Sequence, residues 1–286
     1  MKGPRGEADM AGRVVAARGG MKMPALGLGT WKMGRDSARR KAEIAALQLG
    51  IDLGVTLIDT AEMYDDAESV VGEAIKGRRE SLFIVGKVLP SNASRKGTIE
   101  ACERSLKKLQ TDRLDLYLLH WEGLYPLEET YAAFERLAAA GKIRHYGVSN
   151  FDPDKMAESE STPGGMKIAS NQVMYSLARR GIERKLLPWC RARQVSLMAY
   201  SPLDKGDLAA KPALAAIARR HAVAPETVAI AWTMRDPLVC SIPKASKAEH
   251  VRANAAARDL VLAPEDLAEL DRAYPAPARD VPLDMT

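Results

Sequence analysis

The sequence predicts a (β/α)8 TIM barrel with a short N-terminal hairpin and a C-terminal strap. Short runs rich in leucine or β-branched residues alternate eight times with longer segments in which apolar residues recur at helical spacing. Successive strand ends lie about 23 to 43 residues apart, the length of one βα unit. Eight such units favour closure into a barrel over an open sheet. The 286 residues, 47% of them hydrophobic, suffice to bury the core of a barrel.

The elements follow in regular order along one predicted domain, residues 1–286. Residues 1–12 are expected to form a flexible tail, and residues 13–25 a hairpin that turns at Gly19-Gly20. The predicted strands are residues 25–29, 57–60, 82–88, 114–120, 145–150, 169–173, 196–201 and 239–244. The clearest helices cover residues 37–53, 98–110 and 127–140, and two more begin at Asp152-Pro153 and Ala224-Pro225. Three prolines predict that residues 273–286 form a non-helical strap over the barrel.

A doubly wound open sheet is the rival architecture. Such a sheet usually carries a glycine-rich turn after its first strand, and Gly27-x-Gly29 matches the first two glycines of that pattern. The third glycine position is occupied by Lys32. Two glycines are weak evidence, so they are interpreted as a tight exit from the first strand.

Composition argues against several classes of protein. The 42 basic and 37 acidic residues are interspersed, and no basic stripe is interleaved with aromatic residues, so we expect no nucleic-acid partner. No apolar leader and no run of eighteen apolar residues is present, which predicts a cytoplasmic protein without a membrane partner. Cys102, Cys190 and Cys240 lie far apart, and we expect them to be reduced and buried, not in disulfides or a zinc site.

Polar residues end three consecutive apolar runs. In a barrel the chemistry lies at the C-terminal ends of the strands, where Asp59, Tyr64, Lys87 and His120 stand. Each has an ordinary interpretation: Asp59 as a helix cap, Lys87 as a solvated rim residue, and His120 as a satisfied core histidine. Together, four different titratable groups at neighbouring strand ends predict a catalytic site without a metal.

The four groups suit the reduction of a carbonyl. A phenol titrates at about pH 10, and a nearby ammonium would lower that pKa, so Lys87 would make Tyr64 a better proton donor. Asp59 would balance Lys87 and hold it in place. His120, as a neutral ring, would donate a hydrogen bond to the substrate oxygen as negative charge develops there.

Motifs in fixed order along the chain carry a resemblance to a known family. They are GLGTW at 27–31, DTAEMY at 59–64, GK at 86–87, LDLYLLHW at 114–121, GVSNF at 147–151, NQV at 171–173, AYSPL at 199–203 and IPKAS at 242–246. From about residue 26 to residue 270 the chain resembles the aldo-keto reductases. It looks most like bacterial members that reduce methylglyoxal and related aldehydes, because of DTAEMY, LLPWC at 186–190, and YPAP and PLDM near the end.

The resemblance implies a role for individual residues. Asp59, Tyr64, Lys87 and His120 match the family's catalytic tetrad, with Tyr64 as general acid. The residues matched to NADPH binding are Gly29, Thr30, Ser149, Asn150, Gln172, Tyr200, Ser201, Leu203, Lys244 and Asn254. Trp31 and Trp121 match apolar walls of the substrate pocket, and the C-terminal tail is expected to help line it. A monomer is the family's usual state.

Two departures from the family pattern concern the loops. Where many members have Ser and Arg after the lysine of the last strand, this chain has Ala245 and His250, with Ser246 and Arg252 as candidate substitutes. Lys244 still favours NADPH over NADH, since a cation gains more from a phosphate than from a hydroxyl. The second departure is the segment 64–68, which is one residue longer than the family's usual version and is expected to reshape the pocket entrance.

The sequence is compatible to different degrees with three classes of function. The favoured one is an oxidoreductase that reduces small aldehydes or 2-oxoaldehydes with NADPH. A cofactor-binding regulatory or structural protein is the second, because this fold also serves as potassium-channel β-subunits and lens crystallins. A metal-dependent hydrolase is the third, and it is disfavoured because the four histidines do not form ligand pairs with nearby carboxylates.

Overall fold

The barrel is built from eight parallel strands in chain order. The computed structural model describes residues 13–204, 208 and 212–285, and in this part of the chain each strand from β3 to β10 lies beside the next one in the sequence. Its strands are β3 (Gly27–Gly29), β4 (Leu57–Asp59), β5 (Phe83–Val88), β6 (Leu114–Leu119), β7 (Ile143–Ser149), β8 (Ser170–Met174), β9 (Ser196–Tyr200) and β10 (Val239–Ser241). Parallel bridges from Leu26 to Ser241 and from Gly29 to Lys244 join the first and last strands. The prediction of a (β/α)8 barrel is confirmed, and the open sheet is excluded.

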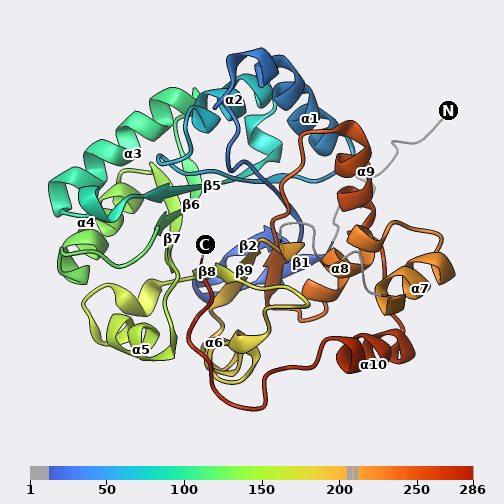
Figure 1. Cartoon of the computed structure of the whole chain (residues 1–286). Helices are drawn as coiled ribbons and strands as arrows, with labels where there is room; N and C mark the ends of the chain where they lie inside the picture. Colours follow the sequence, from blue (N-terminus) through green and yellow to red (C-terminus); the bar gives the residue numbers. More distant parts are fainter. Residues whose placement is uncertain (1–12, 205–207, 209–211, 286) are drawn as a thin grey trace, which may run out of the picture.

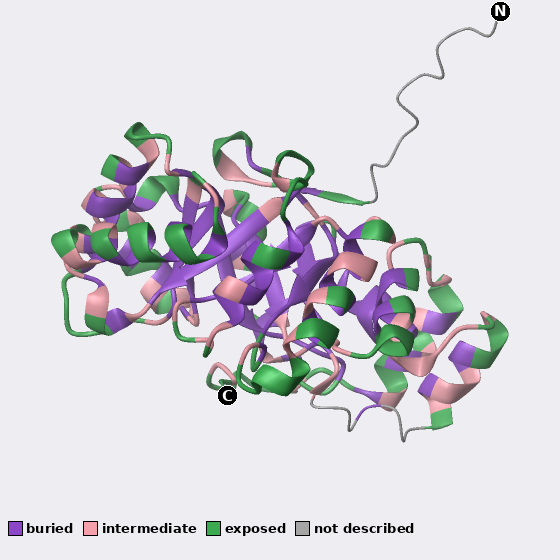
Figure 2. Ribbon diagram, turned by 90° about the horizontal axis from the view of Figure 1, so that it is seen from above, coloured by how far each residue is buried: buried purple, intermediate pink, exposed green. Residues whose placement is uncertain are grey.

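Helices surround the sheet, as Figure 1 shows. They are α1 (Arg40–Asp52), α2 (Ala67–Ala74), α3 (Arg95–Leu109), α4 (Leu127–Ala139), α5 (Pro153–Ser161), α6 (Leu186–Arg193), α7 (Pro212–Arg220), α8 (Pro225–Thr233), α9 (Ala248–Ala256) and α10 (Pro264–Ala273). Seen from above, their outer faces are exposed while the strands between them are buried (Figure 2). No helix in the described residues is both long enough and apolar enough to cross a bilayer.

Local chemistry explains where the predicted boundaries shift. Helix α3 begins three residues earlier than expected, because the Ser94 side chain caps it by accepting a hydrogen bond from the Gly97 amide. The last strand ends at Ser241 and not at residue 244, since Pro243 has no amide hydrogen to continue the ladder. Strand β7 starts two residues before the predicted position, where Ile143 pairs with Leu114.

The N-terminal hairpin closes the bottom of the barrel. It pairs β1 (Val14–Ala16) with β2 (Lys22–Pro24) around a turn at residues 18–20, as predicted. Its side chains Val15, Met21 and Met23 are fully buried in the main core. The Arg18 amide donates to the carbonyl of Gln194, just before β9, which places the hairpin at the N-terminal ends of the strands. The opposite end stays free for chemistry.

The C-terminal segment and the cysteines have the structure that the sequence predicts. Residues 274–285 contain no helix, as expected of a strap, and residue 286 and the predicted tail 1–12 lie outside the described residues. All three cysteines are free and buried, as predicted. Burial raises the pKa of Cys102 and of Cys190 to about 12, and it also raises the pKa of Cys240.

Candidate active site

A buried ion pair lies at the C-terminal ends of β4 and β5. Lys87 Nζ donates hydrogen bonds to Asp59 Oδ2 at 2.7 Å and to the Thr60 carbonyl at 2.8 Å. It donates a third, longer one to the Tyr64 hydroxyl at 3.4 Å. Lys87 is fully buried and Asp59 is 2% exposed, so the pair is shielded from water. The structure therefore brings together the first three residues that the sequence singled out.

His120 lies beside this ion pair, at the end of β6. Its ring centroid is 5.7 Å from that of Tyr64, in an edge-to-face arrangement. Burial, reinforced by the charge of Lys87, lowers the pKa of His120 to about 3, so the ring is neutral at physiological pH, as predicted. The buried Nδ1 has no hydrogen-bond partner in the described part of the chain. A buried polar atom without a partner is unusual in a structural histidine and common at a site that awaits a ligand.

The predicted acidity of Tyr64 needs correction. Burial raises the pKa of the phenol, and although Lys87 lowers it, Asp59 raises it again, so the net shift is upward from 10.0. The expectation of a lowered pKa considered only the ammonium and not the loss of water around the phenol. For the cation Lys87, burial acts in the opposite direction and lowers the pKa. The charges of Asp59 and Tyr64 raise it by more, so the net pKa of Lys87 is raised and the ammonium persists.

Asp59 is fixed by residues that the resemblance assigns to the cofactor. Gln172 Nε2 donates to Asp59 Oδ1 at 2.8 Å, and Thr30 Oγ1 donates to the Asp59 carbonyl at 2.8 Å. Both side chains are buried. The side-chain nitrogen Nε2 of Gln172 donates to Asp59, so the side-chain oxygen Oε1 is the Gln172 atom that can accept from a ligand. The structure links Thr30, just after β3, and Gln172 in β8, both matched to the cofactor by the resemblance, directly to Asp59.

A second polar group lies over the ends of β7 and β9. The Asn150 amide donates to the His120 carbonyl and to Ser149 Oγ, both at 3.2 Å, and its oxygen accepts from the Tyr200 hydroxyl at 3.0 Å. Ser149 Oγ in turn donates to the backbone carbonyl of Gln172. Asn150 has φ 62° and Ser201 has φ 50°, in the left-handed region that few residues other than glycine adopt. Such backbone strain gathers at ligand sites, which agrees with the cofactor role predicted for both.

Lys244 lies at the junction of the first and last strands, close to other cations. Partial burial lowers its pKa, and Arg39 and Lys32 lower it further, whereas only Glu43 raises it. Its Nζ lies 3.4 Å from Ser246 Oγ, so the candidate substitute is within reach. A cluster of positive charge at this end of the barrel suits a phosphate.

The remaining predicted cofactor residues differ in exposure. Asn254 is buried in α9, and Leu203 packs against the core at its edge. Arg252 and His250 are exposed on α9, and His250 Nε2 lies 3.4 Å from Glu249 Oε1. At Gly29, an added Cβ would lie 2.8 Å from the Ile242 carbonyl oxygen, so this position has no room for a side chain.

The two tryptophans predicted for the substrate pocket lie in different surroundings. The ring of Trp121 is 4.8 Å from that of His120, next to the catalytic groups. Trp31 is 44% exposed and has Lys32 Nζ 4.2 Å from its ring centroid. None of the described contacts joins Trp31 to the tetrad, whereas Trp121 adjoins it.

Sequence reasoning missed Glu62, two residues before Tyr64. Its carboxylate accepts from the Leu89 amide at 2.7 Å and from Asn92 Nδ2 at 3.0 Å, which ties the loop after β4 to the loop after β5. The loop that carries Tyr64 is thereby fixed against the strand that carries Lys87. The only signal in the sequence was an acidic residue inside DTAEMY, which does not by itself reveal its partners.

Comparison with known proteins agrees with this geometry. The model of the aldo/keto reductase family matches residues 25–275. Methylglyoxal reductase YeaE of Escherichia coli is 50% identical over 96% of this chain and all of its own length, and glyoxal reductase of Bacillus subtilis is 35% identical over 90% of this chain and 91% of its own. An aldo/keto reductase from Klebsiella pneumoniae in complex with NADP and acetate superposes with a TM-score of 0.93 at 48% identity, covering 96% of this chain and all of that one. This chain therefore belongs to the aldo/keto reductase family.

Proposed function

We propose that this protein is an NADPH-dependent reductase of small aldehydes, 2-oxoaldehydes such as methylglyoxal among them. The observation that carries the proposal is the Tyr64 hydroxyl 3.4 Å from a buried ammonium, with a neutral His120 ring beside it. The names of two relatives, a methylglyoxal reductase and a glyoxal reductase, support the substrate class. We further propose that residues 1–286 form a single domain that acts as a monomer in the cytoplasm.

The residues present fit an NADPH molecule. The positive charges of Lys32 and Arg39 act on Lys244, which follows β10. Such a group of cations suits a phosphate of the cofactor. Asn150 and Ser201 have the left-handed backbone geometry that gathers at ligand-binding turns. The backbone carbonyl of Gln172 accepts from Ser149 Oγ and its Nε2 donates to Asp59, so its side-chain oxygen Oε1 is the atom proposed to accept from an amide.

We assign each part of the NADPH molecule to a group of residues. Ser149, Asn150 and Gln172 would hold the nicotinamide amide and Tyr200 its ring, while Ser201 and Leu203 would hold the pyrophosphate. Gly29, Thr30, Lys244, Ser246, His250, Arg252 and Asn254 would line the remainder of the cofactor site. NADPH, when bound, supplies the hydride that reduces the carbonyl carbon.

The chain supplies the proton and stabilises the charge. The O–H bond of Tyr64 breaks as the carbonyl oxygen of the substrate takes the proton, which leaves a phenolate. Lys87 stabilises that phenolate through the contact already present, and Asp59 keeps Lys87 in place. His120 is neutral and can donate one hydrogen bond to the substrate oxygen as it becomes negative. Because the pKa of Tyr64 lies above 10, the phenol remains protonated throughout the neutral range.

The decisive experiment measures NADPH oxidation with methylglyoxal and a panel of aliphatic and aromatic aldehydes, with NADH in parallel. Turnover of aldehydes with NADPH is the expected result. Tight binding of NADPH without turnover of any aldehyde would instead favour a regulatory cofactor-binding protein. Activity that survives a chelator would agree with the absence, among the described residues, of any group of three metal-ligating side chains.

Lys244→Ala should weaken NADPH binding more than NADH binding. The lost ammonium faces the proposed 2′-phosphate, which NADH lacks, and a charge-assisted hydrogen bond contributes about 1.5–3 kcal/mol, or roughly 10- to 150-fold in affinity. Fluorescence titration with both nucleotides measures the difference. Lys247→Ala is the matched control, because this exposed lysine lies three residues further on and contacts only Glu249 at 4.0 Å. Equal losses for both nucleotides would place the phosphate elsewhere.

Trp121→Ala should change the preference among aldehydes more than the affinity for NADPH. The ring adjoins His120, so its removal enlarges the space next to the substrate carbonyl but leaves the proposed cofactor contacts in place. Steady-state kinetics with a small and a bulky aldehyde will show a shift in the ratio of their kcat/KM values. Trp189→Ala in α6 is the control, since its ring packs under Arg193. An unchanged ratio would remove Trp121 from the pocket wall.

A further inference from the structure

The C-terminal strap, residues 275–285, is held to the barrel largely by charge. Eight of its eleven residues are exposed, and only Pro277, Leu283 and Asp284 are partly covered. Asp280 forms ion pairs with Arg184 at 2.9 Å and with Lys185 at 2.6 Å. Ion pairs between exposed side chains are individually weak, so a change in one of them can shift how the strap is seated.

The middle of the strap packs onto the barrel only in part, through Val281 against Gly181 and Leu283 against the core. Residues 280–284 form one wall of a cavity of about 170 Å³ whose other walls are the start of α5 and residues 181–186. Asp280 and Asp284 are the charged side chains that hold the strap on either side of this cavity, and the Pro277 carbonyl also accepts from Arg184 Nη1 at 3.4 Å. Asp284 Oδ1 is held by Arg179 Nη1 at 3.2 Å.

Arg179 also holds a second carboxylate, in a different loop. Its Nε lies 3.4 Å from Asp204 Oδ1. Asp204 closes a tight turn by donating its amide to the Ser201 carbonyl at 3.0 Å. Ser201, with φ 50°, and Leu203 in the same turn are the residues proposed to contact the pyrophosphate. One guanidinium therefore contacts both the strap and the cofactor turn.

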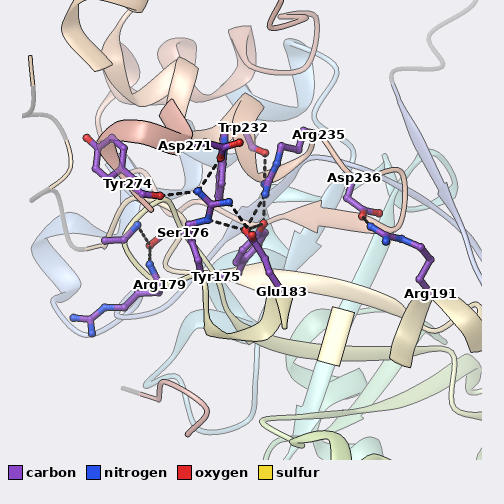
Figure 3. Close-up of polar contacts among 12 residues, drawn as sticks. Tyr175, Ser176, Arg179, Glu183, Arg191, Trp232, Arg235, Asp236, Asp271 and Tyr274 are labelled. Atoms are coloured by element: carbon purple, nitrogen blue, oxygen red, sulfur yellow. Dashed lines mark hydrogen bonds and ion pairs between the residues drawn. The ribbon is translucent and has the colours of Figure 1, made fainter. Parts of the chain in front are cut away.

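The backbone around Arg179 is fixed by an independent network. Ser176 Oγ accepts from the Arg179 amide at 3.2 Å, and the next residue, Arg180, binds Glu183 at 2.8 Å and Asp271 at 2.8 Å. Figure 3 shows this loop anchored to the network around Arg235, while the side chain of Arg179 points away from it. The backbone of Arg179 is therefore held in place by contacts that do not involve its guanidinium. Its pKa is raised by Asp204 and then by Asp284, so the charge is permanent.

We infer that Arg179 is a positioning residue that couples cofactor binding to the seating of the C-terminal strap. The inference rests on the proposed function, because it takes the cofactor turn as assigned. A bound nucleotide orders residues 201–204, Asp204 then restrains the guanidinium, and the restrained guanidinium loses less freedom when it pairs with Asp284. Coupling between two binding events is reciprocal, so a seated strap also strengthens nucleotide binding.

A fluorescent label on the strap tests this coupling. The three native cysteines are buried, so a Met285→Cys variant, whose site is 57% exposed, can be labelled selectively with fluorescein maleimide. NADP+ is the probe because it does not fluoresce, and calorimetry measures its binding separately. Addition of NADP+ is expected to raise the anisotropy of the label as the strap becomes seated.

Two further substitutions in the labelled protein separate coupling from simple loosening. Arg179→Met should abolish the anisotropy response and weaken NADP+ binding by about two- to fivefold, the range of one partly exposed ion pair. Asp280→Asn removes the other strap anchor without touching Arg179. It should lower the starting anisotropy and, by the same reciprocity, weaken NADP+ binding no more than Arg179→Met does, yet the anisotropy response should persist.

The outcomes distinguish the inference from the function on which it rests. If NADP+ does not bind by calorimetry, the proposed function is wrong and the coupling is wrong with it. If NADP+ binds but the label does not respond, or if the response survives Arg179→Met, only the coupling is overturned. An equal loss of the anisotropy response in Arg179→Met and Asp280→Asn would also overturn it, since Arg179 would then not be the specific link.

Discussion

Tyr64→Phe is expected to lower kcat for aldehyde reduction by about 10²- to 10⁴-fold, the usual contribution of a general acid. Only the hydroxyl that gives its proton to the substrate is lost, while the ring keeps its edge-to-face contact with His120. Affinity for NADPH should therefore stay nearly unchanged. Steady-state kinetics with methylglyoxal give the first value, and fluorescence titration of NADPH gives the second.

Tyr146→Phe provides the matched control for this experiment. It removes the same hydroxyl from a tyrosine in β7 that donates at 2.7 Å to the Gly164 carbonyl, away from the ion pair. Its loss should cost about 1 kcal/mol in the free energy of unfolding and leave kcat unchanged. If Tyr64→Phe retained more than a tenth of the wild-type kcat while the control behaved as expected, another group would have to supply the proton.

Lys87→Met should impair both catalysis and folding. Asp59 would be left buried and charged without its partner, and breaking a buried ion pair from one side costs about 3–5 kcal/mol of stability. The phenol would also lose the one nearby charge that lowers its pKa, so turnover should fall as well. Denaturant unfolding and steady-state kinetics measure the two effects.

The double variant Asp59→Asn with Lys87→Met separates these two effects. It removes both charges, so much of the lost stability should return, because no uncompensated buried charge remains. Activity should not return, since no ammonium stabilises the phenolate. Recovery of activity together with stability would show that the ion pair is structural and that Lys87 has no part in the reaction.

The fold was predictable because one pattern recurs along the chain. Most of the barrel strands are short buried runs, and three consecutive ones carry a titratable residue near their C-terminal ends. Asp59, Lys87 and His120 stood out in the sequence for that reason, and the structure brings them within contact distance of one another or of Tyr64. Their common location follows from topology alone, which places parallel strand ends at one face.

What the sequence did not predict depends on how loops fold and how much water they exclude. The upward shift of the Tyr64 pKa arises from burial by neighbouring loops, and no spacing of residues encodes that quantity. Glu62 binds the Leu89 amide only because two loops come together in space. Arg179 likewise meets Asp204 and Asp284 across 25 and 105 residues of chain.

The burial of the three cysteines limits their reaction with the carbonyl compounds that are the proposed substrates. Dicarbonyl compounds are electrophiles that add readily to thiolates, and the thiolate is the reactive form of cysteine. With pKa values of about 12 at Cys102 and Cys190, and with Cys240 wholly enclosed, almost no thiolate exists at neutral pH. All three cysteine sulfur atoms are thus held, protonated and buried, away from the aldehydes that the protein is proposed to reduce.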